Sequence, residues 1–234
     1  MEAMPDNIKL VIFIGPPGSG KDTQANLLVQ EYGFVQVPSS RIIRAKFAAH
    51  PNDPVIRAQQ KIFDEGKLND PVLVSEWILE FVRPLAAQGK SLVFSGSPRT
   101  PYEGEEELPA LQKLYGRENV VLIYLGIDLE EIKKRIKDRR FCKANGHPVS
   151  GAPEFAHLKV CPIDGSPLER RALDDPHLIL TRVEEFTTLT YPVVDIARKF
   201  GIPIFNVDGK QTIEGVHHQI ANIIERRTTP PPLE

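Results

Sequence analysis

The chain has 234 residues, of which 41% are hydrophobic, and a formal net charge of −2. This size allows one large domain with a buried core, and the lack of a net positive charge argues against a nucleic-acid-binding protein. We expect no membrane contact, because no apolar run approaches the ~20 residues of a membrane span and the first residues do not resemble a signal peptide. The two cysteines predict a reducing, cytoplasmic location.

Five short runs rich in β-branched and aromatic residues alternate with helical patterns. They are residues 8–14, 34–37, 91–95, 119–127 and 202–207. Strands that alternate with helices are typical of a parallel sheet covered by helices on both faces. The sequence therefore predicts an α/β fold of three layers with a five-stranded parallel sheet.

The first of these runs is followed by the glycine-rich stretch GPPGSGKDTQ, residues 15–24. Its glycines and prolines end the strand and leave backbone N–H groups beside the N-terminus of the next helix, where anions bind well. The spacing from Gly15 and Gly20 to Lys21 is that of a phosphate-binding loop, although Asp22 stands where such loops usually carry a Ser or Thr ligand of magnesium. A tight turn between domains is the alternative, but the order strand, loop, lysine and helix favours a nucleotide site.

Two stretches interrupt the alternation of strands and helices. Residues 39–88 contain helical patterns and no strand, whereas residues 141–171 are rich in glycine and proline and contain both cysteines. A structureless segment of about thirty residues is uncommon in a compact domain unless it forms a lid or a binding flap. Further helices are expected from about residue 174 to 200 and over 212–227, and the proline-rich tail 229–234 is expected to be disordered.

Six segments occur in the order and spacing of the adenylate kinases, which are nucleoside monophosphate kinases. They are GPPGSGKDTQ, SSRIIR, GKL, GSPRT, KRIKDRR and RRALDD with a following TR, and they extend over about residues 8–225. The chain therefore resembles this family. The resemblance implies a P-loop core, a helical insert that binds the monophosphate, and a closing lid. The corresponding segments are 1–38, 89–140 and 172–228 for the core, 39–88 for the insert and 141–171 for the lid.

The resemblance also implies a reaction. Adenylate kinases transfer the terminal phosphoryl group of ATP to AMP with magnesium, and catalysis of such a transfer is mostly positioning and electrostatic stabilisation. An arginine suits this task because its planar guanidinium group binds phosphate oxygens through paired hydrogen bonds. The catalytic residues implied are Lys21, Arg99, Arg139, Arg171 and Arg182. By position alone, an arginine on a helix could equally be a solvated surface charge.

Two nucleotide sites follow from the same resemblance. The ATP site comprises the phosphate loop and three distant residues: Gly18, Ser19, Gly20, Lys21, Asp22, Thr23, Arg135, Arg139 and Gln211. The acceptor site comprises residues of the insert, the GSPRT segment and the region after the lid: Ser39, Arg44, Lys67, Leu68, Asn69, Gly96, Ser97, Pro98, Arg99, Glu103, Arg171 and Arg182. We expect a monomer that acts on small nucleotides.

The chain departs from the family pattern at two functional positions. The family usually has an aspartate where this chain has Ser95, and that aspartate orders the water shell of magnesium; we expect Asp22 to compensate. Glu103 stands where the family has a base-reading glutamine, and an ionised carboxylate can only accept hydrogen bonds. AMP remains the first-choice acceptor, although Glu103 would suit guanine or cytosine better unless it points to solvent. The alternatives are a kinase that prefers GMP or CMP, and a nucleotide-binding regulator with weak turnover.

The two lid cysteines raise a question about zinc. The segments CKAN (142–145) and CPID (161–164) resemble the half-knuckles of zinc-bearing lids in some family members, with Asn145 in place of one cysteine. A tetrahedral zinc site could still form from four side chains: Cys142, His147, Cys161 and Asp164. Because asparagine is a poor zinc ligand, the favoured interpretation is a hydrogen-bonded lid with two free thiols.

Overall fold

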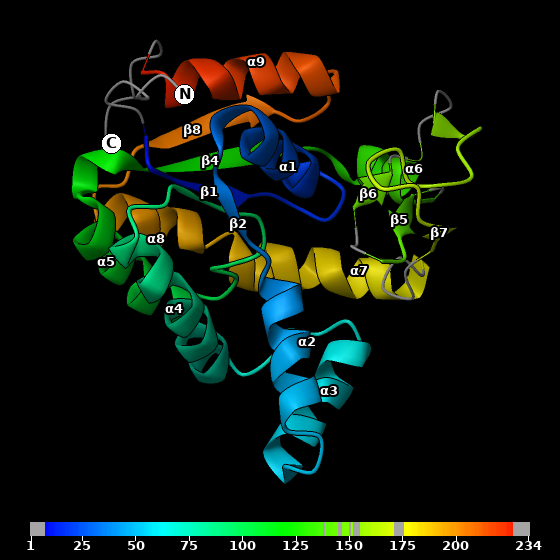
Figure 1. The fold of residues 1–234 in the computed structure, drawn as a ribbon, viewed down its shortest axis with the longest axis horizontal. Coiled ribbons are helices and arrows are strands. Elements are labelled where there is room, and N and C mark those ends of the chain that lie inside the picture. The colour runs from blue at the N-terminus through cyan, green and yellow to red at the C-terminus, as the bar shows by residue number, and fades with distance from the viewer. Residues whose placement is uncertain are drawn as a thin grey trace.

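The computed structural model of the chain describes residues 8–137, 139–144, 147–149, 151, 155–170 and 176–226. At its centre is a parallel sheet of five strands in the order β2-β3-β1-β4-β8 (Figure 1). In that order the strands are Val35–Val37, Leu92–Phe94, Leu10–Ile14, Val120–Gly126 and Ile204–Asp208. Each strand overlaps one of the five predicted runs, so the predicted α/β fold with a five-stranded parallel sheet is confirmed.

Strand β1 shows why this sheet is covered on both faces. All five of its residues are apolar and buried, as expected for a central strand of a parallel sheet. Leu10 and Ile12 belong to one hydrophobic core, which contains side chains of α4 (Pro71–Ala87), α5 (Pro101–Tyr115) and α8 (Val193–Lys199). Val11 and Phe13 belong to a second core, built with α1 (Lys21–Tyr32) and α9 (Ile213–Ile224). The sheet is therefore the middle of three layers.

The chain between β2 and β3 is helical. It contains α2 (Ser39–Ala49), α3 (Pro54–Asp64) and α4, and α2 and α3 project away from the sheet (Figure 1). The carboxylates of Asp53 and Asp70 cap α3 and α4 by accepting hydrogen bonds from two backbone N–H groups each, and a proline follows each cap. These helices occupy the segment expected to form the acceptor-binding insert.

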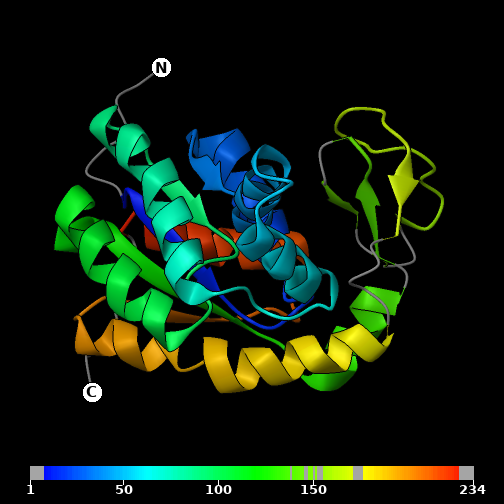
Figure 2. The ribbon, with the colours of Figure 1, turned by 90° about the horizontal axis from the view of Figure 1, so that it is seen from below.

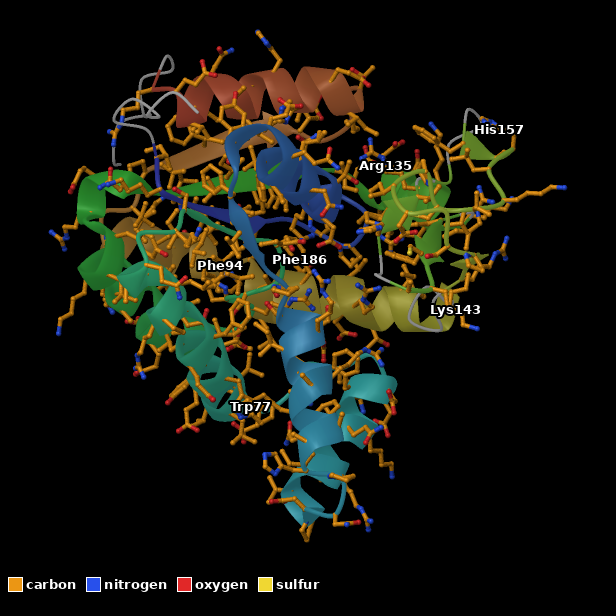
Figure 3. All side chains as sticks on the ribbon, viewed as in Figure 1. Trp77, Phe94, Arg135, Lys143, His157 and Phe186 are labelled. Carbon is orange, nitrogen blue, oxygen red and sulfur yellow. The ribbon has the colours of Figure 1, made fainter. Side chains whose placement is uncertain are left out.

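Aromatic side chains connect the three helices of this segment. Phe47 of α2 makes edge-to-face contacts with Phe63 of α3 and Trp77 of α4, with ring centroids 5.9 and 6.5 Å apart. Trp77 lies far from the lid, on the side of α4 that faces α2 (Figure 3). The arrangement makes the insert a small packed unit of its own, attached to the core through α4.

A small antiparallel sheet lies on the opposite side of the molecule from α4 and α5 (Figure 2). Its strand order is β6-β5-β7, and the strands are Pro148–Val149, Arg140–Cys142 and Leu168–Glu169. The helix α6 (Leu129–Lys137) leads into it, and α7 (Pro176–Glu185) runs back from it beneath the core (Figure 2). The segment expected to be a lid thus contains regular structure that its glycine- and proline-rich composition did not predict.

The single long helix predicted for about 174–200 is interrupted in the structure. After α7 comes a π-helical turn, η4 (Phe186–Thr190), in which the backbone N–H of Tyr191 donates to the Phe186 carbonyl at 2.7 Å. The hydroxyl groups of Thr187 and Thr188 donate to carbonyl groups four residues earlier, which competes with regular helical hydrogen bonds. The turn lies near the centre of the molecule, as the position of Phe186 shows (Figure 3).

The remaining regular element is a short 3₁₀ turn, η1 (Arg117–Asn119), before β4. Among the described residues, we find no helix that combines the length and the apolar character needed to cross a membrane.

Candidate functional site

The loop between β1 and α1 holds Lys21 at the carboxyl end of the central strand. Its Nζ atom donates to the carbonyl oxygens of Gly15 and Pro16, at 2.6 and 2.9 Å, and to Ser19 Oγ at 3.2 Å. All three partners belong to the loop itself. The lysine is thus folded back onto backbone oxygens, which a bound anion can replace.

Glycine is required at several positions of this loop. Gly18 and Gly20 have φ values of 81° and 101°, in the left-handed region that side chains rarely adopt. A Cβ atom at Gly15 would lie 2.5 Å from the carbonyl oxygen of Leu125 on β4. The loop can therefore approach the neighbouring strand only because Gly15 has no side chain.

Cationic side chains surround Lys21. Burial lowers the pKa of Lys21 to about 7; Asp22 opposes the shift, and three arginines add to it, namely Arg99, Arg182 and Arg139. These arginines come from three separate segments of the chain. A bound polyanion would reverse the effect, because negative charge favours the protonated lysine.

A cleft of ≈ 830 Å³ opens at this position, which is within the usual range for small-molecule sites. It extends over the ends of the strands and is bordered by the insert, the lid and α7. The cleft brings together many of the predicted site residues: Lys21, Asp22, Ser39, Arg44, Lys67, Leu68, Gly96, Ser97, Pro98, Arg99 and Arg182. Ser95 also lines it, and Ser95 Oγ accepts a hydrogen bond from Gln36 Nε2 at 3.1 Å.

Arg99 is fixed by contacts on two sides. Its backbone N–H donates to the Glu103 carboxylate at 2.8 Å, and its carbonyl oxygen accepts from the Thr190 hydroxyl of η4, also at 2.8 Å. A Cβ atom at Gly96 would lie only 3.2 Å from Arg99 Nη2 and 3.3 Å from Ser39 Oγ. The absence of a side chain at Gly96 thus allows the guanidinium group and the insert to approach each other.

Comparison with known sequences assigns the chain with this fold and cleft to a protein family. A sequence profile described as adenylate kinase matches residues 13–202. The chain belongs to the adenylate kinase family. It is accordingly a phosphotransferase, and the family implies ATP and AMP as substrates and a magnesium-bound nucleotide.

Individual members of the family match over nearly their whole length. An adenylate kinase of Sphingopyxis alaskensis is 31% identical over 218 residues, which is 92% of this chain and 96% of that protein. An adenylate kinase of Trichomonas vaginalis is 30% identical over 216 residues, or 91% of each chain. One from Archaeoglobus fulgidus is 30% identical over 219 residues, or 92% of this chain and 98% of that protein.

Other predicted residues lie outside the lining of the cleft. Arg135 Nε pairs with Glu131 at 2.7 Å, and Arg135 Nη1 lies 3.5 Å from the Gly18 carbonyl oxygen. The Arg139 guanidinium group lies over the Phe141 ring, 4.9 Å from its centroid, and Gln211 is exposed after β8. Ser19 and Thr23 belong to the loop and to α1. Arg171 lies outside the described residues, as does the tail 229–234.

Glu103 has a structural role that a sequence signal could have revealed. The backbone N–H of Glu103 donates to Thr100 Oγ1 at 3.2 Å, while its carboxylate accepts from the Thr100 hydroxyl at 3.1 Å and from the Arg99 N–H. The Thr100 hydroxyl thus caps α5 in the sequence pattern Thr-x-x-Glu of a capping box, while the carboxylate binds the backbone N–H of Arg99, one residue before the cap. The side chain is 2% exposed, so Glu103 does not point to solvent. It lines a small pocket beside the cleft.

A second carboxyl group, which the sequence analysis did not identify, lies behind Glu103. Glu107 is fully buried, and Ser97 Oγ lies 2.7 Å from one of its oxygens and 3.3 Å from a Glu103 oxygen. Burial raises the pKa of Glu107 well above its usual range, and the nearby Glu103 raises it further. Burial also raises the pKa of Glu103, although its hydrogen bonds and Arg99 oppose this shift. When Glu107 carries a proton it is neutral, so it does not repel the carboxylate of Glu103. Both carboxyl groups can then hydrogen-bond to the Ser97 hydroxyl.

The four candidate zinc ligands in the lid lie together. Their potential ligand atoms are all within 4.8 Å of one another. Cys142 Sγ is 3.0 Å from an Asp164 oxygen, and His147 Nδ1 is 3.2 Å from Asp164 and 3.5 Å from Cys161 Sγ. Tetrahedral zinc with ordinary bond lengths separates such ligands by about 3.3–3.8 Å. The donor set therefore suits a zinc ion, and shifts of a few tenths of an ångström would bring these three distances into that range.

The buried Glu107 predicts a pH-dependent stability. Because its pKa is raised in the native state, the native protein keeps a proton that the unfolded chain loses as the pH rises above 4.5. The wild type should therefore lose stability with rising pH, by at most ~1.4 kcal/mol per unit from this group, until the raised pKa is passed. Urea unfolding at pH 5, 6, 7 and 8 should show that the Glu107→Gln variant gains stability relative to wild type as the pH rises.

The matched control is Glu106→Gln, since Glu106 is exposed on the same helix. Its unfolding free energy should run parallel to that of the wild type. If the Glu107→Gln curve also ran parallel to wild type, Glu107 would titrate as an ordinary carboxyl group.

Proposed function

We propose that this protein transfers the terminal phosphoryl group of ATP to AMP, with ATP at the phosphate loop and the acceptor phosphate against Arg99. The observation that supports this is the convergence of cationic side chains from separate segments in one cleft, with Lys21, Arg44, Arg99 and Arg182 all lining it. Phosphoryl transfer between two nucleotides needs this arrangement, because several negative charges must be held close together.

In this proposal each residue has a defined task. The loop N–H groups and the N-terminus of α1 bind the ATP phosphates, and Lys21 exchanges its carbonyl partners for phosphate oxygens. Arg44 and Arg99 orient the acceptor phosphate. Arg182, together with Arg139 and Arg171, stabilises the charge that develops during transfer, and closure of the lid excludes water.

Lys21→Met tests the proposal directly. The variant should fold, since among the described residues Lys21 donates hydrogen bonds only within its own loop, but should lose at least about a hundredfold in turnover with ATP and AMP. ADP formation measured in a coupled assay gives the rate, and circular dichroism monitors folding. Lys113→Met, at an exposed position on α5, is the control and should keep full activity.

Two results of this assay would contradict the proposal. Turnover of Lys21→Met within tenfold of wild type would remove the lysine from the chemistry. Binding of ATP by the wild type without steady ADP formation would indicate the alternative, a nucleotide-binding regulator. A panel of AMP, GMP, CMP and UMP identifies a kinase that prefers GMP or CMP.

We further propose that Asp22 supplies the carboxylate for magnesium that Ser95 lacks. Both residues line the cleft, and Asp22 is close enough to Lys21 to shift its pKa. Magnesium prefers oxygen ligands and keeps several of its waters, so a carboxylate at the start of α1 can order this water shell. When bound, the ion neutralises phosphate charge. Ser95 instead binds Gln36 and links β3 to β2.

The roles of Asp22 and Ser95 can be separated by magnesium titration. Asp22→Asn should raise the magnesium concentration needed for half-maximal turnover, because the amide carries no charge to hold the hydrated ion. Adding Ser95→Asp to that variant should restore part of the lost affinity. An unchanged titration for Asp22→Asn would exclude it from magnesium binding.

We also propose that the lid binds zinc through Cys142, His147, Cys161 and Asp164. The sequence favoured a metal-free lid because Asn145 replaces one expected cysteine. His147 lies close to Asp164 and Cys161, so it offers the fourth ligand from a position two residues further on. When bound, zinc would fix the lid loops through four strong bonds.

Metal analysis of protein purified without chelator tests this assignment. We expect about one zinc per chain in the wild type and a loss of zinc in Cys161→Ser, because a hydroxyl is a much weaker zinc ligand than a thiolate. His157→Ala is the control, since His157 is an exposed lid histidine outside the cluster and should not affect zinc content. A wild type without stoichiometric metal would support the hydrogen-bonded lid.

A further inference from the structure

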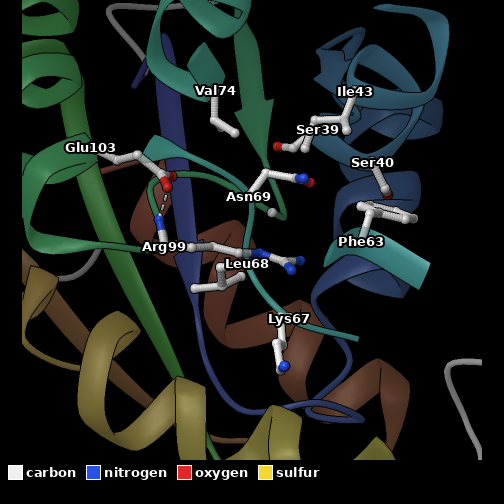
Figure 4. Close-up of a pocket in the computed structure, with 11 residues that line it drawn as sticks. Ser39, Ser40, Ile43, Phe63, Lys67, Leu68, Asn69, Val74, Arg99 and Glu103 are labelled. Atoms are coloured by element: carbon white, nitrogen blue, oxygen red, sulfur yellow. Dashed lines mark hydrogen bonds between the residues drawn. The ribbon is translucent and has the colours of Figure 1, made fainter. Parts of the chain in front are cut away.

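A small pocket of ≈ 40 Å³ adjoins the cleft where the insert meets the core (Figure 4). Four of its lining side chains are apolar, namely Ile43, Phe63, Leu68 and Val74. It shares Ser39 and Arg99 with the cleft, so it is a side chamber of the acceptor site. The volume admits about three water-sized groups, which suits the edge of a nucleobase but not a whole ring.

Two buried polar atoms of residues that line this pocket have no hydrogen-bond partner within the described part of the chain. They are Ser39 Oγ and Asn69 Oδ1, on residues that are 4% and 6% exposed. A buried polar group without a partner costs free energy, so such groups are rare in native proteins. Both belong to residues that line the same pocket (Figure 4), which indicates that a ligand supplies the missing partners.

The orientation of the Asn69 amide is determined by its neighbours. The backbone N–H of Asp70 donates to Gln59 Oε1 at 2.8 Å, which identifies that atom as an oxygen. Asn69 Nδ2 lies 3.0 Å from the same oxygen and 2.7 Å from the Gln59 carbonyl oxygen. A flipped amide would place oxygen against both oxygens, so Nδ2 must be the donor and Oδ1 must be the atom left without a partner.

Glu103 contrasts with Asn69, although both line the pocket. Its carboxylate already accepts hydrogen bonds from Arg99 and Thr100 at the start of α5. The hydrogen-bonding capacity of Asn69 Oδ1 is entirely unused. Since Oδ1 can only accept, its partner must be an N–H or O–H donor of the ligand.

We propose that Asn69 is a specificity residue, and that its Oδ1 atom accepts a hydrogen bond from the exocyclic amino group of the acceptor base. The inference rests on the proposed function, because it places the acceptor nucleotide in this site. The pocket suits the edge of a base, and the amino group of adenine supplies the donor that Oδ1 lacks. An oxo group at the same ring position would face Oδ1 as a second acceptor and be rejected. The hydroxyl of Ser39 can donate a hydrogen bond to a neighbouring ring nitrogen of the base.

The experiment compares AMP with purine riboside 5′-monophosphate, which lacks only the amino group, and with IMP, which carries an oxo group there. Wild type should use AMP with a kcat/KM at least about tenfold above that of either analogue. In Asn69→Leu, kcat/KM for AMP should fall about tenfold, while kcat/KM for purine riboside monophosphate should change less than threefold. The ratio of the two substrates is the decisive quantity, because a general loss of structure lowers both alike.

Two further variants keep the test conclusive. Asn69→Leu removes one donor from Gln59 Oε1, which still accepts from the Asp70 N–H, and the smaller variant Asn69→Ala should show the same loss of discrimination. Glu103→Gln should leave the ratio of AMP to purine riboside monophosphate within threefold of wild type if Asn69 is the reader. Binding of AMP and its analogue by calorimetry gives the same comparison without turnover.

The outcomes separate this inference from the proposed function. A wild type that does not phosphorylate AMP would contradict the proposed function itself. A wild type that is active on AMP, with an unchanged substrate ratio in the Asn69 variants, would overturn only the role of Asn69. A ratio that collapses in Glu103→Gln but not in the Asn69 variants would assign base reading to Glu103 instead.

Discussion

The mutual repulsion of positive charges at the end of the central strand is the constraint on which this structure depends. Burial lowers the pKa of Lys21 to about 7, and the nearby arginines lower it further, although Asp22 opposes the shift. In the absence of anions, Lys21 is stabilised by loop carbonyl oxygens. Such a cluster is suited to binding polyanions, because the negative charge of bound phosphates offsets the repulsion between the cations. The rigid three-layer core holds these cations in place against their repulsion.

Arg99 shows how the surrounding structure holds one of these cations. The start of α5 fixes it through the Glu103 capping interaction, and the π-helical turn η4 fixes it through Thr190. Behind Glu103, the buried Glu107 shares Ser97 with it. The same few residues therefore cap a helix, position an arginine and line the acceptor pocket. A change at any of them should affect more than one of these tasks.

The insert and the lid both contribute residues to the lining of the cleft. Each has contacts of its own that keep it together: aromatic packing around Phe47 in the insert, and the cluster around Asp164 in the lid. Units that are internally packed can move as bodies relative to the core, which is what closure over two nucleotides requires. The pocket at Asn69 lies where the insert meets the core, so the acceptor site that we propose there would change with the position of the insert.

The sequence by itself determined the sheet, the phosphate loop and the family. These features are encoded locally: a strand covered on both faces is a continuous apolar run, and the loop needs glycine where φ is positive. The sequence also placed Arg44, Arg99 and Arg182 in one site through the family resemblance, and the cleft contains all three.

Only the tertiary structure decided how side chains distant in sequence share their hydrogen bonds. The sequence placed Glu103 as a base reader or a solvated charge, whereas the fold buries it as a helix cap next to Glu107. The sequence named His147 only as a candidate to replace the ligand lost at Asn145, whereas the fold brings it within reach of the other three candidate ligands. The unused oxygen of Asn69 depends on Gln59, ten residues earlier on α3. Hydrogen-bond partners are set by packing in three dimensions, and local sequence patterns carry no record of which buried groups remain unpaired.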